Sequence, residues 1–381
     1  MLNSRNAILI TYPSQGAVKE ATSLADTAGY SIEIIVSQHH ITRSRYGIGS
    51  GKAEEVKELV EQLKPQVIIF DEVLKPSQQY NLASLCKVEI IDRERLILEI
   101  FERRASTAES RFQIKLAQLR YDMVRAREKV RLAKTGEQPG FFGMGKYDAD
   151  VYYLDIKKRA SVIKKKLEKE EIRRKLYRIQ RLKAGLPTVS IAGYTSAGKT
   201  TLFNTLTGES KSAGTGIFTT LSTSTRAVIF KPGKVLVSDT VGFISKLPAY
   251  MVDAFKSTLH ELIYSDLVLL VIDISQSIEE VRRKLDSSMR VMNELGVPMT
   301  KVLYVMNKVD LTRIEDAFDK STYLDMLDSK KRVLPVSAKT GFNIDQLKNI
   351  MTSLLFPEKS RRPDDEHKEE DEEEYNEGIS S

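Results

Sequence analysis

The stretch Gly193–Thr200 constrains the fold more than any other part of the chain. It reads Gly-Tyr-Thr-Ser-Ala-Gly-Lys-Thr, follows the apolar run Val189–Ala192, and precedes a pattern typical of an amphipathic helix. A strand, a Gly-x-x-x-x-Gly-Lys-Thr turn and a helix in this order indicate a P-loop, whose backbone N–H groups and helix N-terminus cradle phosphates. Lys199 would then reach the outer phosphates, and the Thr200 hydroxyl would ligate Mg²⁺.

Three further motifs follow the ends of later predicted strands. They are Asp239-Thr240-Val241-Gly242 after the strand 235–238, Asn307-Lys308-Val309-Asp310 after 302–306, and Ser337-Ala338-Lys339 after 333–336. In a P-loop enzyme the aspartate of the first motif holds Mg²⁺, and the N–H of its glycine meets the γ-phosphate. The Asp310 carboxylate can accept from two neighbouring donors of guanine, a layout that adenine lacks. The four motifs in this order predict a site for GTP or GDP with Mg²⁺.

The predicted site residues follow from these motifs. Asn307 is expected to brace the loop, the Lys308 stem to lie along the base, and the Ala338 N–H to lie near guanine O6. The predicted nucleotide-binding residues are Gly193, Tyr194, Thr195, Ser196, Ala197, Gly198, Lys199, Thr200, Thr201, Asp239, Gly242, Asn307, Lys308, Asp310, Ser337, Ala338 and Lys339. The predicted catalytic residues are Lys199, Thr220 and Gly242, and the predicted metal ligands are Thr200, Thr220 and Asp239. We favour Thr220 for these two roles, although Thr219 could take its place.

The apolar patterns predict an α/β fold in two parts with a helical hairpin between them. Residues 1–98 alternate short apolar runs with helical stretches, which indicates an N-terminal α/β domain with a parallel sheet. Long helical patterns over 92–134 and 149–182, separated by a Gly/Pro-rich break, predict a basic αα-hairpin at 99–184. Residues 185–357 read as a Ras-like P-loop domain, and 358–381 as a disordered acidic tail.

Charge is distributed unevenly along the 381 residues. The net charge is +7, but residues 103–183 carry 24 lysines and arginines against 10 acidic residues, whereas 357–381 carry 4 against 11. A solvated helix face is the plain interpretation, yet an excess this large favours a polyanion such as a nucleic acid. We find neither an apolar stretch of bilayer-spanning length nor a signal peptide, and expect a cytoplasmic monomer.

The glycine-rich, basic loop at Arg45–Lys52 in the N-terminal domain has two possible interpretations. Its spacing differs from that of a P-loop because Tyr46 occupies the position of the first glycine. A structural turn and a second phosphate site, for RNA or for ATP, explain it equally well.

The motifs together resemble the HflX family of translational GTPases. The resemblance rests on the P-loop with Phe218–Leu221, Asp239–Ile244, Leu247-Pro248 and Ala254–Glu261, and in the first half on Ile48–Glu55, Asp92-Arg93 with Ile97–Phe101, and Leu116–Tyr121. It implies a GTPase that binds the large ribosomal subunit and splits or rescues ribosomes under stress, with the basic hairpin reaching ribosomal RNA. Ser196 departs from the family's asparagine, which in related GTPases helps to hold a potassium ion. Gly143–Lys146 and Leu154–Arg159 depart from two family motifs near the hairpin tip.

The residue after Gly242 suggests how fast GTP is hydrolysed. Many GTPases place a water-orienting glutamine there, but this chain has Phe243, which has no polar group. We therefore predict slow intrinsic hydrolysis that a partner accelerates. The alternatives are a GTP-regulated factor for ribosome assembly or RNA remodelling, and a nucleotide-gated RNA-binding module.

Overall fold

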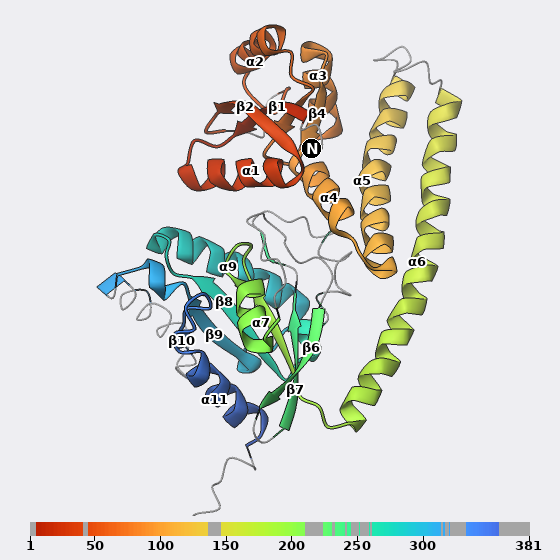
Figure 1. Cartoon of the computed structure of the whole chain (residues 1–381). Coiled ribbons are helices and arrows are strands. Elements are labelled where there is room, and N and C mark those ends of the chain that lie inside the picture. The colour runs from red at the N-terminus through yellow and green to blue at the C-terminus, as the bar shows by residue number, and fades with distance from the viewer. Residues whose placement is uncertain are drawn as a thin grey trace, which may run out of the picture.

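The fold consists of two parallel-sheet units and a helical hairpin (Figure 1). The structure is a computed structural model, and it describes residues 5–40, 45–135, 146–209, 224–230, 233–240, 242–244, 251, 259, 261–313, 315–316, 320 and 333–357. In Figure 1 the two sheets lie one above the other, and the hairpin runs beside both.

The first unit is a four-stranded parallel sheet. Its strands are β1 (Arg5–Thr11), β2 (Tyr30–Ser37), β3 (Val67–Phe70) and β4 (Glu89–Asp92), in the order β2-β1-β3-β4. The connecting helices are α1 (Gln15–Thr27), α2 (Ser50–Leu63) and α3 (Pro76–Cys86). Alternate residues of β1 enter different cores: Leu9 packs in the same core as α1, and Ile10 in the same core as α2 and α3. The prediction of a parallel sheet is confirmed, and helices cover both of its faces.

Two helices, α4 (Arg93–Arg104) and α5 (Ala108–Thr135), occupy the stretch for which the sequence predicts one long helical run. The prediction is wrong at residues 105–107, where the chain leaves the helix. The Ser110 N–H donates to Thr107 Oγ1 at 3.1 Å, and the Thr107 N–H donates to Ser110 Oγ at 3.3 Å. This reciprocal cap starts a new helix. Leu96, Ile97 and Phe101 of α4 are buried in the same core as α1, so α4 packs with the N-terminal sheet.

The hairpin consists of α5 and α6 (Lys146–Lys183). Leu116, Leu119 and Ala126 of α5 form a small core with Ile156 and Ala160 of α6. Much of the remaining surface of α6 is cationic. Its exposed basic side chains include Lys157, Lys158, Arg159, Lys164, Lys165, Lys166, Lys169, Arg173 and Lys175. The predicted basic hairpin is present, with a narrow apolar packing stripe between its helices and an exposed basic surface.

The second unit is a six-stranded sheet. Its strands are β5 (Thr188–Gly193), β6 (Ser224–Phe230), β7 (Gly233–Asp239), β8 (Leu267–Asp273), β9 (Val302–Asn307) and β10 (Val333–Pro335), in the order β10-β9-β8-β5-β7-β6. Among the strands that the structure describes here, only β6 is antiparallel to its neighbour. Helix α9 (Ile278–Leu295) shares one core with the sheet, and α7 (Lys199–Thr207) and α11 (Ile344–Leu355) share another. Short 3-10 helices span Met299–Lys301 and Val309–Leu311.

The predicted fold class is confirmed: an N-terminal parallel-sheet α/β unit with a long αα-hairpin precedes a P-loop α/β unit. The predicted domain boundaries stay a prediction, and the tail 358–381 lies outside the described residues. Among the helices that the structure describes, none is long and apolar enough to cross a bilayer.

Candidate nucleotide site

The P-loop lies between β5 and α7, where two glycines allow close approach of neighbouring strands. A Cβ on Gly193 would lie 2.3 Å from the Val271 carbonyl oxygen of β8, and a Cβ on Gly198 would lie 2.2 Å from Asn307 Nδ2. Both glycines also adopt positive φ angles, of 140° and 95°. Only glycine satisfies both demands, so the motif is fixed here by packing and backbone geometry together.

Lys199 lies under the loop at the start of α7. Its side chain is buried, with 7% exposed, and its Nζ donates to the Tyr194 carbonyl oxygen at 2.7 Å. Burial lowers the pKa of Lys199 to about 8, although the nearby Asp239 carboxylate raises it, and the neighbouring Lys308 adds a smaller lowering effect. A buried ammonium at the end of a P-loop is suited to an anionic ligand.

Two oxygen ligands suited to Mg²⁺ meet beside Lys199. The Thr200 hydroxyl donates to Asp239 Oδ2 at 3.0 Å, and Asp239 is fully buried at the end of β7. Hydroxyl and carboxylate oxygens are the hard donors that this ion takes, usually together with waters and phosphate oxygens. The donor set therefore fits the predicted metal. The third predicted ligand, Thr220, and its alternative Thr219 lie outside the described residues.

The segment after Asp239 is tied to the P-loop by backbone hydrogen bonds. The Phe243 N–H donates to the Gly193 carbonyl at 2.9 Å, and the Thr195 N–H donates to the Phe243 carbonyl at 2.8 Å. A Cβ on Gly242 would lie 2.8 Å from Lys199 Nζ. The Phe243 ring is 3% exposed and packs in the core. Gly242 thus lies against the P-loop lysine, as the motif order predicts.

Asn307 joins three of the four motifs. Its Nδ2 donates to the Ala197 carbonyl at 2.8 Å, and its Oδ1 accepts from the Ala338 N–H at 2.9 Å. The side chain is 2% exposed. The predicted bracing role of Asn307 is therefore a pair of buried hydrogen bonds that fix the P-loop against the loop after β10.

The edge of the site beyond Asn307 carries an exposed carboxylate. Ser337 Oγ donates to Asp310 Oδ1 at 2.6 Å, which orients an exposed side chain without burying it. Lys308 Nζ donates to Asp273 Oδ2 at 2.6 Å. Asp273 ends β8 and was missed by the sequence interpretation, although a polar residue at the carboxyl end of a parallel strand was a usable signal.

The remaining predicted residues lie around this centre. Thr201 follows Thr200 in the first turn of α7, Lys339 is exposed after Ala338, and Ser196 is exposed at the tip of the P-loop with a φ of 62°. The structure therefore brings together all predicted nucleotide-binding residues, within the part of the chain that it describes.

Family models match three successive stretches of the chain. The description "GTP-binding GTPase N-terminal" matches residues 15–102, "GTP-binding GTPase Middle Region" matches 104–181, and "50S ribosome-binding GTPase" matches 188–308. The last match covers the P-loop, the Asp239–Gly242 segment and the first two residues of the Asn307 motif.

Curated relatives are similar over nearly the whole chain. GTPase HflX of Thermofilum pendens is 41% identical over 364 residues, which cover 94% of this chain and 85% of that protein. The chain belongs to the HflX family of GTPases. The family's members in Methanocaldococcus jannaschii and Escherichia coli are 43% and 36% identical over 89% and 90% of this chain, and these matches cover 83% and 79% of the two relatives. The resemblance seen in the sequence motifs is confirmed.

Solved structures agree with this assignment. The crystal structure of a protein named SsGBP in complex with GDP is 27% identical, has a TM-score of 0.56, and aligns over 92% of this chain and 98% of that one. A GTP-binding protein from Sulfolobus solfataricus, also with GDP, has a TM-score of 0.51 at 27% identity, over 92% and 98% of the two chains. As an HflX-family GTPase, the chain binds GTP and GDP with Mg²⁺ and hydrolyses GTP.

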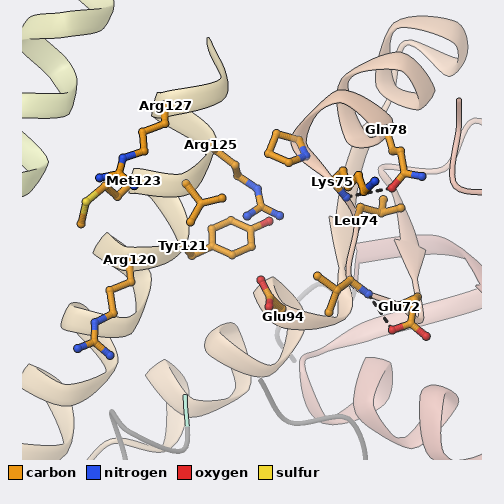
Figure 2. A pocket seen from close by; sticks show the side chains of 13 residues that line it. Glu72, Leu74, Lys75, Gln78, Glu94, Arg120, Tyr121, Met123, Arg125 and Arg127 are labelled. Carbon is orange, nitrogen blue, oxygen red and sulfur yellow. Dashed lines mark hydrogen bonds between the residues drawn. The ribbon is translucent and has the colours of Figure 1, made fainter. Parts of the chain in front are cut away.

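A separate cavity of about 790 Å³ lies between the N-terminal sheet and the hairpin (Figure 2). In Figure 2, Tyr121 and Arg125 of α5 face Leu74 and Lys75, which precede α3. The Arg125 guanidinium lies 3.2 Å from the centre of the Tyr121 ring and donates to the buried Asp92 at 2.6 Å. These contacts join the hairpin to the N-terminal sheet.

The glycine-rich loop at 45–52 is packed into the N-terminal core. Ile48 is fully buried, and a Cβ on Gly47 would lie 2.7 Å from the Leu74 side chain. Lys52 is paired with Glu55 at 2.7 Å. Packing thus accounts for the glycine and the isoleucine, as the structural-turn interpretation requires, while the second phosphate site stays a prediction.

Proposed function

We propose that this GTPase binds the large ribosomal subunit in its GTP state and splits or rescues ribosomes, acting as a cytoplasmic monomer. The observation that carries the proposal is the exposed basic surface of α6, joined directly to a GTP-hydrolysing domain through residues 184–187. The family-model description "50S ribosome-binding GTPase" supports the same partner. Ribosomal RNA is a polyanion, so its phosphates are the groups that such a surface attracts.

The proposed roles at the site follow from its geometry. Lys199 would bind the outer phosphate oxygens, and the Gly242 N–H would donate to the γ-phosphate. Thr200, Asp239 and Thr220 would hold Mg²⁺, which neutralises phosphate charge when bound. The base would be held by the Asp310 carboxylate and the Ala338 N–H, with the Lys308 stem beside the ring. The other predicted loop residues, from Gly193 to Thr201, would wrap the phosphates, and Ser337 and Lys339 would complete the base pocket.

The proposed hydrolysis is slow because the chain offers no group at Phe243 to orient the attacking water. The ring is buried and its backbone is tied to the P-loop, which leaves charge stabilisation as the main contribution of the site. A partner that orders the segments around the γ-phosphate would then raise the rate. Ribosome-stimulated turnover is the expected behaviour.

The test is a sucrose-gradient profile of the organism's own ribosomes with the protein and GTP, a non-hydrolysable analogue, or GDP. We expect the triphosphate forms to move the protein onto the large subunit and to deplete joined ribosomes. Protein at the top of the gradient in every state refutes the ribosome proposal. Binding only to immature subunits, without loss of joined ribosomes, would favour an assembly factor instead.

Charge reversal tests the role of α6. The triple change of Lys164, Lys165 and Lys166 to Glu alters an exposed surface and is expected to abolish co-sedimentation while leaving GDP affinity unchanged. The matched control changes three exposed lysines outside the hairpin, Lys19, Lys87 and Lys234, to Glu. The control shifts net charge equally and should still bind. Equal loss in both variants would mean that only net charge matters.

A further inference from the structure

A residue of the N-terminal unit is hydrogen-bonded to the P-loop. The Tyr194 hydroxyl donates to Glu20 Oε2 at 2.6 Å, although 174 positions separate the two residues. Glu20 lies on α1, and Tyr194 is the second residue of the P-loop. Both are largely buried, with 11% of the Glu20 side chain and 5% of Tyr194 exposed. A buried bond to a carboxylate is stronger than an exposed one.

Glu20 is held in place from the other side by its own unit. Its Oε1 accepts from Arg93 at 2.5 Å, and Arg93 also pairs with Asp71, which accepts from Thr11 at 2.7 Å. Burial raises the pKa of Glu20, but Arg93 and the Tyr194 hydroxyl outweigh it and keep the pKa below the ordinary value. Glu20 is thus a fixed, charged acceptor at the carboxyl edge of the first sheet.

Tyr194 is held on several sides at once. Lys284 of α9 lies 5.2 Å from its ring centre, and the Tyr194 hydroxyl donates to Glu20. Its carbonyl oxygen accepts from Lys199 Nζ and from the Ala197 N–H. The residues on either side of Tyr194 are the ones that pair with Phe243. The position of Tyr194 therefore fixes both Lys199 and the distance from the P-loop to Gly242-Phe243.

We propose that Glu20 is a positioning residue of the GTP site, which acts on hydrolysis through the Tyr194 hydroxyl. Glu20 touches no nucleotide in this scheme. It sets the spacing between Lys199, assigned to the outer phosphates, and Gly242, assigned to the γ-phosphate. That spacing affects the rate of hydrolysis, because charge develops on the transferring phosphoryl group in the transition state. It has little effect on binding of the β-phosphate, which the loop backbone surrounds. The inference rests on the proposed roles of Lys199 and Gly242.

The expected signature is a lower kcat at nearly constant GDP affinity. Tyr194→Phe removes only the hydroxyl, and Glu20→Leu removes the acceptor while Arg93 keeps Asp71. Each change should lower kcat about fivefold, as expected for one hydrogen bond, and change the Kd of GDP less than twofold. The double variant should match Glu20→Leu, because loss of the Glu20 carboxylate already severs the bond that Tyr194→Phe removes. Glu20→Gln keeps an acceptor oxygen and should restore most of the rate.

The matched control is Tyr30→Phe, which removes a tyrosine–glutamate bond of the same length, 2.6 Å, inside the N-terminal unit. Its kcat should equal that of the wild type. Thermal unfolding of every variant separates rate effects from loss of fold. An unchanged kcat in Tyr194→Phe, or additive losses in the double variant, would overturn the role of Glu20. A Lys199→Met variant with wild-type kcat would refute the proposed site itself, and with it the basis of the inference.

Discussion

The buried charge of Lys199 makes nucleotide binding depend on pH. Among the protein's own groups, burial lowers the pKa of Lys199 from 10.5 to about 8. A bound phosphate oxygen beside Nζ would raise the pKa again, because an opposite charge favours the ammonium form. Nucleotide binding should therefore take up a proton wherever Lys199 is neutral beforehand. The neutral fraction of Lys199 in the nucleotide-free protein is about one tenth at pH 7, one half at pH 8 and three quarters at pH 8.5.

The affinity follows from the same fractions. Only the protonated form offers an ammonium group to the phosphates, so the affinity for GDP should fall about fourfold between pH 7 and pH 8.5. Isothermal titration in two buffers of different ionisation enthalpy measures the proton count directly. We expect an uptake of about half a proton per GDP at pH 8. The direction of the pKa shift determines whether a proton is taken up. A carboxylate partner without burial would raise the pKa of Lys199, and GDP binding would then take up no proton between pH 7 and pH 8.5.

The same shift predicts the stability of the protein without nucleotide. Between pH 8 and the unfolded value of 10.5, the unfolded chain binds more protons at Lys199 than the folded chain does. The contribution of this group to the free energy of unfolding therefore rises with pH across that window.

A GDP affinity that stays constant from pH 7 to pH 8.5, with no proton uptake, would show that Lys199 is not held in a desolvated site and would refute this reasoning.

Three further predictions test the surroundings of the site. Asp273→Asn removes the charge that holds Lys308 at 2.6 Å, and should weaken GDP binding about threefold to tenfold in a fluorescence titration, with the fold intact by circular dichroism. Arg125→Ala leaves the buried Asp92 carboxylate without its ion pair and should destabilise the N-terminal unit by about 3 kcal/mol or more in urea unfolding. Ser196→Asn places a residue that tolerates a φ of 62° at the loop tip, and should raise stability by up to about 1 kcal/mol; a loss would mean that the Ser196 hydroxyl makes a needed contact.

The parts of the fold that could be predicted depend on local patterns. Strands such as β3 and β8 are continuous apolar runs, which parallel buried strands require, and the P-loop glycines have positive φ angles that other residues rarely adopt. The order of the motifs at strand ends then fixes the site, because the carboxyl ends of neighbouring parallel strands meet at one edge. Asn307 could be assigned for this reason before its two hydrogen bonds were known.

The parts that could not be predicted depend on contacts between distant residues or on caps with weak signals. The break before α5 rests on Thr107 and Ser110, which are common residues within a strongly helical pattern. The bond between Glu20 and Tyr194 has no local signal, because an acidic residue on an amphipathic helix usually faces solvent. The contacts between the two units therefore cannot be predicted from the sequence and are found only in the structure.

The contacts between the units differ enough in strength to show which of them transmits a displacement to the GTP site. Arg181 of α6 meets Glu261 at 3.5 Å, with 35% and 26% of the two side chains exposed. Such a pair contributes less than about 1 kcal/mol and breaks readily. The bond from Tyr194 to Glu20 is buried, and Arg93 fixes its acceptor. A force on the hairpin would thus separate Arg181 from Glu261 first, whereas a movement of α1 would act on the P-loop directly. Ribosome contacts that stimulate hydrolysis should therefore act through the N-terminal unit, and Tyr194→Phe should reduce the stimulated rate by a larger factor than the basal rate.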